Sequence, residues 1–289
     1  MSVVLITGCS SGIGLATALA FARGGMTTYA TMRDLSKAEK LQNCADAEDL
    51  TLQILPLDVT DDASVEAAIR VIKEQHDGVD ILVNNAGVGF NGPVETMPLE
   101  RAHAVFETNV WGPIRLVRAV LPTMRERRSG VIVNVGSIVG RIPGWPHNGF
   151  YGASKHALSI LTDALSWELA PFGVRMVIVE PEFYATELLH SGVAGSIVDG
   201  PYRDDQRWAA DYALRACEQA GGDPADVAEA IVAAALAPDS PVHVPIGPGG
   251  PSLAKSATAV SSFEDWVKIV TQIMESLAGP RPNGSVARS

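Results

Sequence analysis

Short runs of apolar, often β-branched residues alternate along the chain with stretches whose apolar positions recur at helical spacing. The apolar runs predict strands at residues 3–7, 27–32, 51–57, 79–84, 130–136, 174–179 and 242–246. The intervening patterns predict helices at residues 12–24, 36–47, 62–75, 99–127, 151–170 and 224–236. Strands that are apolar throughout and alternate with helices are typical of a parallel sheet covered on both faces. We therefore predict an α/β fold with a doubly wound, parallel seven-stranded sheet.

Two segments interrupt this alternation. Residues 182–223 contain no predicted strand but several aromatic residues, and long insertions at the ligand end of a sheet commonly form lids or binding loops. We expect a helical lid there; a surface excursion with its own small core is the alternative. The main domain is expected to span 1–247. Residues 248–289 then form a C-terminal extension with a disordered tail and one amphipathic helix at 262–277, whose apolar face includes Phe263.

Composition restricts the class of protein. The 289 residues are 47% apolar and carry a formal net charge of −11, so a nucleic-acid partner is not expected. No apolar run approaches the length of a membrane span. The three cysteines are widely spaced and the six histidines show no metal-ligand spacing, which favours a reducing, cytoplasmic location and no metal site.

The first predicted strand ends in a glycine-rich turn, TGCSSGIG, at residues 7–14. Such a turn between a strand and a helix lets backbone N–H groups approach a pyrophosphate, as in Rossmann-like folds. The same residues also match the nucleophile elbow of hydrolases, with Ser10 as nucleophile. That elbow needs an oxyanion-hole donor from an earlier strand–helix loop, and the seven residues before Gly8 leave no room for one.

The second predicted strand ends at Met32, where an acidic residue would hold an adenosine ribose in an NAD-binding protein. Arg33 follows, and a guanidinium suits a 2′-phosphate. This favours NADP(H) over NAD(H); a solvated Arg33 beside Asp34 is the alternative.

Tyr151 and Lys155 lie four residues apart at the start of a predicted helix and therefore share one helical face. A nearby ammonium group and a bound nicotinamide cation both stabilise phenolate and lower the pKa of a tyrosine, which makes Tyr151 a usable general acid/base. Ser137, at the end of the fifth predicted strand, is placed to bind a substrate carbonyl oxygen together with Tyr151.

These motifs resemble the short-chain dehydrogenase/reductase family. The resemblance covers residues 3–186 and is closest to its 17β-hydroxysteroid and retinol dehydrogenase-like branch. The matching motifs, in family order, are TGCSSGIG, LDVT at 57–60, NNAG at 84–87, TNVWG at 108–112, VGS at 135–137 and YGASK at 151–155.

The resemblance implies roles for individual residues. In the catalytic group, Tyr151 transfers the proton, Ser137 orients the substrate oxygen, Lys155 binds the nicotinamide ribose and Asn109 holds a water. The implied cofactor-binding residues are Gly8, Ser10, Ser11, Gly12, Ile13, Gly14, Arg33, Asp58, Val59, Asn85, Ala86, Gly87, Tyr151, Lys155, Pro181 and Thr186. The expected reaction is hydride transfer between NADP(H) and a carbonyl or alcohol. A non-catalytic NADP(H)-binding sensor or scaffold is the alternative.

The residues around this site indicate the substrate. Trp145 and Phe150 precede the catalytic helix, Phe183 and Tyr184 follow the sixth strand, and basic residues are few there. With Ser137 they predict a pocket for a small apolar ketone or alcohol. Apolar residues on the long helices, among them Val110, Trp111, Leu158 and Leu165, favour a homodimer or homotetramer; ordinary core packing is the alternative.

One residue departs from the family pattern. Where the resemblance implies Pro-Gly-x-x-x-Thr wrapping the nicotinamide, this chain has Glu182 after Pro181. Glycine allows backbone conformations that glutamate reaches only with strain. We expect the Glu182 side chain to point away from the nicotinamide, where it reshapes the entrance of the substrate cleft, pairs with a lid residue or weakens cofactor binding.

Overall fold

The structure, a computed structural model, describes residues 2–182, 184, 197, 199–220 and 222–282. In this part of the chain seven parallel strands form one sheet in the order β3-β2-β1-β4-β5-β6-β7. The strands are β1 (Val3–Thr7), β2 (Thr27–Met32), β3 (Gln53–Pro56), β4 (Ile81–Asn84), β5 (Gly130–Val135), β6 (Val174–Pro181) and β7 (His243–Ile246). The strand order reverses direction beside β1, where β1 lies between β2 and β4, and ligands bind at such a switch point in doubly wound sheets.

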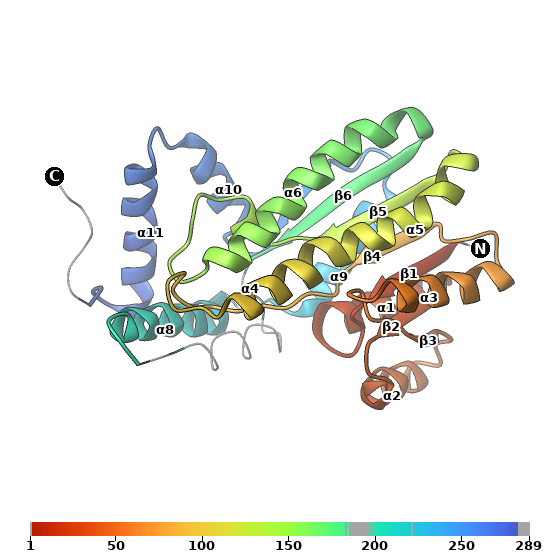
Figure 1. Cartoon of the computed structure of the whole chain (residues 1–289), viewed down its shortest axis with the longest axis horizontal. Coiled ribbons are helices and arrows are strands. Elements are labelled where there is room, and N and C mark those ends of the chain that lie inside the picture. Colours follow the sequence, from red (N-terminus) through yellow and green to blue (C-terminus); the bar gives the residue numbers. More distant parts are fainter. Residues whose placement is uncertain (1, 183, 185–196, 198, 221, 283–289) are drawn as a thin grey trace.

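Helices cover both faces of the sheet (Figure 1). The α-helices are α1 (Gly12–Arg23), α2 (Glu39–Ala47), α3 (Asp62–Gln75), α4 (Leu99–Phe106), α5 (Gly112–Glu126), α6 (Gly149–Leu169), α8 (Arg203–Ala220), α9 (Pro224–Leu236), α10 (Gly250–Ala259) and α11 (Phe263–Ala278). The apolar core on one face includes α1, α2 and α9, and the core on the other includes α3 and α5. Alternate residues of β1 enter the two cores, so a strand buried on both sides has to be apolar throughout.

The predicted helix over 99–127 is wrong in one respect. The structure divides it into α4, the π-helical turn η2 (Glu107–Trp111) and α5. Asn109 lies in this turn and is buried. A π-turn inserts an extra residue into a helix and often marks a functional site, and hydrophobic periodicity alone does not reveal it.

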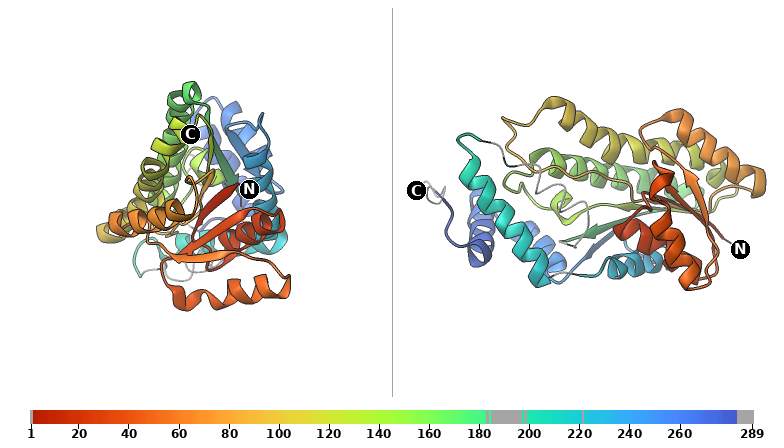
Figure 2. Two further views of the ribbon diagram at one scale, coloured as in Figure 1. Left: turned by 90° about the vertical axis from the view of Figure 1, so that its right-hand side faces the viewer. Right: turned by 90° about the horizontal axis from the view of Figure 1, so that it is seen from below.

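The described part of the C-terminal extension contains two helices, α10 and α11, where the sequence predicted one. Helix α11 packs on its own chain. Trp266, Val270 and Met274 of α11 are buried against Trp208 and Tyr212 of α8 and against residues 138–145. The prediction that Phe263 belongs to this buried face is wrong, because Phe263 is 58% exposed at the first turn of α11. Figures 1 and 2 place α8 and α11 together at the end of the molecule away from the N-terminus. No helix in the described ranges is long and apolar enough to cross a membrane.

Candidate active site

A cavity of about 640 Å³ lies at the carboxyl ends of the central strands. It extends from the glycine-rich turn after β1 to the inner face of α8. Of the predicted site residues, those that line it are Gly8, Ser10, Ser11, Gly12, Ile13, Gly14, Arg33, Asp58, Val59, Asn85, Ala86, Gly87, Ser137, Trp145, Tyr151, Lys155, Pro181 and Tyr184. The fold therefore joins residues that are separated by up to 176 positions in sequence.

The glycine-rich turn is as tight as its composition predicts. Gly8 and Gly12 adopt left-handed φ values of 73° and 55°, which side chains disfavour. A Cβ atom on Gly14 would lie 2.2 Å from the Gly8 carbonyl oxygen. Asn85 closes the turn from β4, since its Nδ2 donates to the carbonyl oxygens of Thr7 at 2.8 Å and Gly8 at 3.1 Å. The side chain of Asn85 is thus held as part of the turn.

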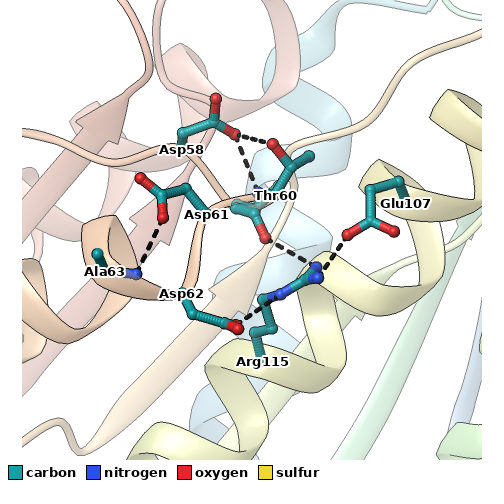
Figure 3. Close-up of polar contacts among 8 residues, drawn as sticks. Asp58, Thr60, Asp61, Asp62, Ala63, Glu107 and Arg115 are labelled. Carbon is teal, nitrogen blue, oxygen red and sulfur yellow. Dashed lines mark hydrogen bonds and ion pairs between the residues drawn. The ribbon is translucent and has the colours of Figure 1, made fainter.

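Asp58, which follows β3, also lines the cavity. Its Oδ1 accepts hydrogen bonds from the backbone N–H of Thr60 at 2.9 Å and from the Thr60 hydroxyl at 2.7 Å (Figure 3). Partial burial raises the pKa of the Asp58 carboxyl. The bonds from Thr60 and the charges of Arg33 and Arg115 outweigh that effect, and the pKa is lowered. Asp58 is therefore an anionic acceptor at neutral pH.

Arg115 ties this wall to the π-turn. Its guanidinium contacts Asp62 Oδ1 at 2.7 Å and Glu107 Oε1 at 2.5 Å, as Figure 3 shows. Val59 packs against Gly112, where a Cβ would approach Val59 Cγ2 to 2.7 Å. The segment after β3 and the turn that contains Asn109 are thus braced against each other.

Two cations line the cavity beside the end of β2. Arg33 was singled out from the sequence, and Lys37, which follows it in η1 (Leu35–Lys37), was missed. Both are exposed. Lys37 lies four residues after Arg33. This spacing alone does not predict that both side chains line one cavity, because the conformation of the turn between them is not known from the sequence.

Ser137, Tyr151 and Lys155 meet in the middle of the cavity. The Ser137 side chain is close enough to the Tyr151 phenol to lower its pKa, and Lys155 Nζ lies 5.8 Å from the centre of the Tyr151 ring. Lys155 Nζ also donates to the carbonyl oxygen of Val135 at 2.8 Å. Gly140 packs directly on the Lys155 backbone, with a Cβ position only 2.7 Å from its carbonyl oxygen, so the segment after β5 lies close against α6.

Burial dominates the pKa values of Tyr151 and Lys155 in the protein without its cofactor. Burial raises the pKa of Tyr151 to about 12, although the Ser137 hydrogen bond lowers it in part. Burial lowers the pKa of Lys155 to about 8. In the protein without its cofactor, burial therefore outweighs any stabilisation of the phenolate by Lys155, because desolvation disfavours the charged form of both groups. The prediction that Lys155 and a bound nicotinamide together lower the pKa of Tyr151 concerns the enzyme with its cofactor and stays a prediction.

Asn109 uses its side chain to hold the neighbouring loop. Its Oδ1 accepts from the backbone N–H of Val88 at 2.9 Å, and its Nδ2 donates to Val88 O at 2.9 Å and to Ser154 Oγ at 3.1 Å. Ser154 in turn donates to the carbonyl oxygen of Tyr151 at 2.7 Å. Ser154, to which no sequence motif assigns a role, links the π-turn to the first turn of α6.

Glu182 turns toward the C-terminal extension. Its backbone φ is not in the left-handed region, so the side chain imposes no such strain. Its Oε2 accepts from the backbone N–H of Gly249, directly before α10, at 2.7 Å. A Cβ on Gly247 would lie 2.8 Å from Glu182 Cβ, and one on Gly249 would lie 2.7 Å from Oε1. Glycines at 247 and 249 thus leave the space that Glu182 occupies.

The remaining substrate predictions have mixed outcomes. Trp145 and Tyr184 line the cavity, whereas Phe150 is not among the residues that form its wall. Phe183 and Thr186 lie outside the described residues. Residues that the sequence analysis missed complete this wall: Phe90, Asn91, His147, Asn148, Gln206, Ala209, Ala210 and Ala213. They come from loops and from one face of α8, and their positions depend on how α8 packs.

Comparison with known proteins identifies the family. The family model described as short chain dehydrogenase matches residues 2–195. The chain belongs to the short-chain dehydrogenase family. As a short-chain dehydrogenase it is an oxidoreductase that acts on CH–OH groups.

Two relatives place this short-chain dehydrogenase in the expected branch. Retinol dehydrogenase 8 of Bos taurus is 41% identical over 240 residues, which are 79% of this chain and 76% of that protein. The 17-beta-hydroxysteroid dehydrogenase type 1 of Mus musculus is 40% identical over 254 residues, which are 82% of this chain and 71% of that protein.

Solved structures agree with the fold. A short-chain dehydrogenase from Streptomyces avermitilis superimposes with a TM-score of 0.76 at 31% identity, covering 96% of this chain and 97% of that chain. A gluconate 5-dehydrogenase from Burkholderia cenocepacia, in complex with NADP and tartrate, gives a TM-score of 0.71 at 26% identity, covering 87% and 95%.

Proposed function

We propose that this short-chain dehydrogenase uses NADP(H) to interconvert an apolar ketone or aldehyde and the corresponding alcohol, with Tyr151 as general acid/base. The main support is that one cavity brings Ser137, Tyr151 and Lys155 together with the glycine-rich turn after β1. A sensor or scaffold that only binds the dinucleotide has no use for the paired Ser137 and Tyr151.

The proposed use of NADP(H) rests on two groups of residues that line the cavity, the glycine-rich turn and the cations that follow β2. The turn at Gly8 and Gly12 and the first turn of α1 would hold the pyrophosphate, because free backbone N–H groups and the helix dipole favour anions. Arg33 and Lys37 would bind a 2′-phosphate. The gluconate 5-dehydrogenase that shares this fold was solved with NADP, which supports the same choice.

The remaining implied cofactor contacts are proposals from the family pattern. Asp58 and Val59 would contact the adenine, and Asn85, Ala86 and Gly87 would flank its ribose. Pro181 and Thr186 would lie beside the nicotinamide. Ser10, Ser11, Ile13 and Gly14 would complete the pyrophosphate turn.

In the reaction, Ser137 would donate a hydrogen bond to the substrate oxygen and Tyr151 would give it the proton during reduction or remove it during oxidation. When bound, the nicotinamide supplies or accepts the hydride. Lys155 would hold the nicotinamide ribose, and its positive charge would favour the phenolate as Tyr151 loses its proton. Asn109 is proposed to hold the loop at Val88 and a water that connects Lys155 to solvent.

The cavity and the surface support the proposed substrate class and the proposed assembly. Trp145 and Tyr184, with the alanines of α8, give the cavity an apolar wall that suits an apolar ketone.

Of the helix residues that favour an oligomer, Val110 and Leu158 are core residues, whereas Trp111 is 52% exposed. Ile160 and Trp167 add exposed apolar surface on α6, which supports a homodimer or homotetramer. The cysteines at 9, 44 and 217 are all unpaired, which supports a cytoplasmic location.

Tyr151→Phe tests the proposed chemistry. The variant keeps the ring but has no proton to transfer, so turnover of apolar ketones with NADPH is expected to fall by about a hundredfold or more. NADPH binding, measured by quenching of protein fluorescence, should change by less than a few-fold. A Tyr151→Phe enzyme with full turnover would contradict the role of Tyr151. NADPH binding without turnover on any ketone by the unaltered protein would favour the sensor.

Arg33→Ala tests the cofactor choice. Charge-assisted hydrogen bonds to a phosphate are worth about 1.5–3 kcal/mol, so NADPH affinity should fall roughly ten- to a hundredfold. NADH affinity should be unchanged, because NADH lacks the 2′-phosphate. Equal losses for both dinucleotides in isothermal titration calorimetry would show that Arg33 acts only through the fold.

A further inference from the structure

The cavity wall contains a charged cluster that the proposed reaction does not use. His147 lines the cavity four residues before Tyr151. Its Nε2 lies 2.8 Å from Asp205 Oδ2 on α8. Arg281 donates to both oxygens of Asp205, each at 2.6 Å. All three side chains are largely buried, with exposed fractions of 11% for His147, 16% for Asp205 and 19% for Arg281.

The backbone at His147 is constrained as well. His147 has a left-handed φ of 56°, which is uncommon for a residue other than glycine and persists only where the surroundings hold it. Its carbonyl oxygen accepts from the backbone N–H of Gly92 at 2.7 Å. The Tyr202 ring and the imidazole form a T-shaped pair, with ring centres 6.4 Å apart. The imidazole is therefore fixed in one orientation at the cavity wall.

The partners of His147 decide which of its nitrogens carries the proton. Burial raises the pKa of the Asp205 carboxyl. The hydrogen bonds from Arg281 and His147, together with the electrostatic effect of both groups, outweigh that effect, and the pKa is lowered. An ionised carboxylate only accepts hydrogen bonds, so Nε2 of a neutral His147 must hold the proton. Nδ1 is then a bare acceptor, and within the described residues no hydrogen bond to it is found.

The wall formed by α8 changes from polar to apolar along the helix. Gln206 follows Asp205 near the start of α8, and Ala209, Ala210 and Ala213 line the cavity further along. At about 1.5 Å per residue, the polar start and Ala213 are roughly 12 Å apart. A molecule that lies along α8 would pack an apolar body on the alanines and place a polar group beside His147.

We propose that His147 is a specificity-determining residue, which accepts a hydrogen bond at Nδ1 from a hydroxyl group of the substrate other than the reacting oxygen. The substrate class is then an apolar ketone with a second hydroxyl, or the matching diol. Asp205 and Arg281 are positioning residues that keep the proton on Nε2. This inference rests on the proposed function, since it concerns the same cavity and the same reaction.

A series of matched ketones tests the inference. Benzylacetone has no polar group besides the ketone, para-hydroxybenzylacetone adds a hydrogen-bond donor, and para-methoxybenzylacetone adds an acceptor alone. The flexible chain of these ketones lets the substituent reach His147, and the corresponding β-tetralones provide a rigid second series. We expect kcat/KM with NADPH to be about three- to tenfold higher for the hydroxylated ketone than for the other two, as one net hydrogen bond supplies.

His147→Gly should remove this preference. Glycine tolerates the left-handed backbone and deletes the imidazole, so the ratio of kcat/KM for the hydroxylated and the plain ketone should fall to about one. Asp205→Asn frees the proton to move to Nδ1, so the hydroxylated ketone should also lose its advantage over the methoxylated one. Tyr202→Phe is the matched control: it keeps the ring on His147, loses only the bond to Glu95, and should keep the preference.

The outcomes separate this inference from the proposed function. No turnover of any ketone by the unaltered protein would refute the proposed function. Turnover of all three ketones at equal kcat/KM would refute the role of His147 alone. The same holds if His147→Gly lowers kcat/KM for all three by one factor, since the residue would then only support the fold. NADPH affinity, unchanged in each variant, shows that the fold is intact.

Discussion

Tyr151 and Lys155 are four residues apart on α6, yet burial acts on them in opposite directions. The pKa of Tyr151 rises to about 12 and that of Lys155 falls to about 8. The protein thus keeps the phenol neutral and holds an ammonium that gives up its proton easily. A bound dinucleotide would add charge beside Tyr151 and Lys155. The pKa values of both groups would therefore change when the cofactor binds.

Lys155→Met tests whether folding lowers the pKa of Lys155. Lys155 binds its proton more weakly in the folded than in the unfolded chain, so stability rises with pH between the folded pKa near 8 and the unfolded value near 10.5. Relative to Lys155→Met, the unaltered protein should gain about 2 kcal/mol between pH 7 and pH 9.5. Urea unfolding at both pH values measures the difference. A constant difference would mean that Lys155 titrates like an exposed lysine.

Glu182 connects three elements. Its backbone N–H donates to Ile246 O of β7 at 2.9 Å, and its carboxylate accepts from Gly249 N–H at the start of α10. A carboxylate at a helix N-terminus satisfies an otherwise free N–H and interacts favourably with the helix dipole. The glutamate that stands in the place of the expected glycine therefore fastens the C-terminal extension to the end of β6.

The contact between Glu182 and Gly249 can be measured as a coupling energy. Gly249→Ala would place a Cβ only 2.7 Å from Glu182 Oε1, displace the carboxylate and cost about 1 kcal/mol of stability. In a Glu182→Gly background the same change should cost almost nothing, which gives a coupling of about 1 kcal/mol. Additive effects in urea unfolding would show that the carboxylate does not contribute there.

At the scale of the whole molecule, the C-terminal extension supports the substrate cavity. Trp266 of α11 is fully buried and its indole N–H donates to Gly144 O at 3.1 Å. Trp208 of α8 donates in the same way to Gly279 O at 2.8 Å. The loop before α6, helix α8 and helix α11 thus form one apolar cluster beside the cavity.

Trp266→Ala should weaken this support. Removal of a buried tryptophan costs about 3–5 kcal/mol, and the loop that contains Trp145 and His147 loses its anchor. KM for a ketone is expected to rise severalfold, while NADPH affinity changes little, because the dinucleotide turn lies on the other side of the cavity. Trp266→Phe keeps most of the packing and serves as the control. Equal loss of both affinities would indicate a general loss of structure instead.

Much of the fold and of the candidate site can be predicted from local sequence patterns. The strand runs, the glycine-rich turn and the spacing of Tyr151 from Lys155 all express short-range constraints, and the structure places them as expected. The π-turn at Asn109 was missed because an inserted residue hardly disturbs the apolar pattern of a long helix. Phe150 was expected in the cavity because of its neighbours in sequence, but a side chain one position from Tyr151 on α6 points to a different side of the helix.

The fold and the family can be recognised from the amino-acid sequence, since each depends on motifs of a few residues in a fixed order. Contacts between distant residues depend instead on three-dimensional packing: Glu182 with Gly249, Asp205 with His147 and Arg281, and Trp266 with the loop before α6. These contacts depend on the packing of α8, α10 and α11, which short-range pattern does not specify. Burial, which sets the pKa of Tyr151 and Lys155, is likewise a property of the packed molecule.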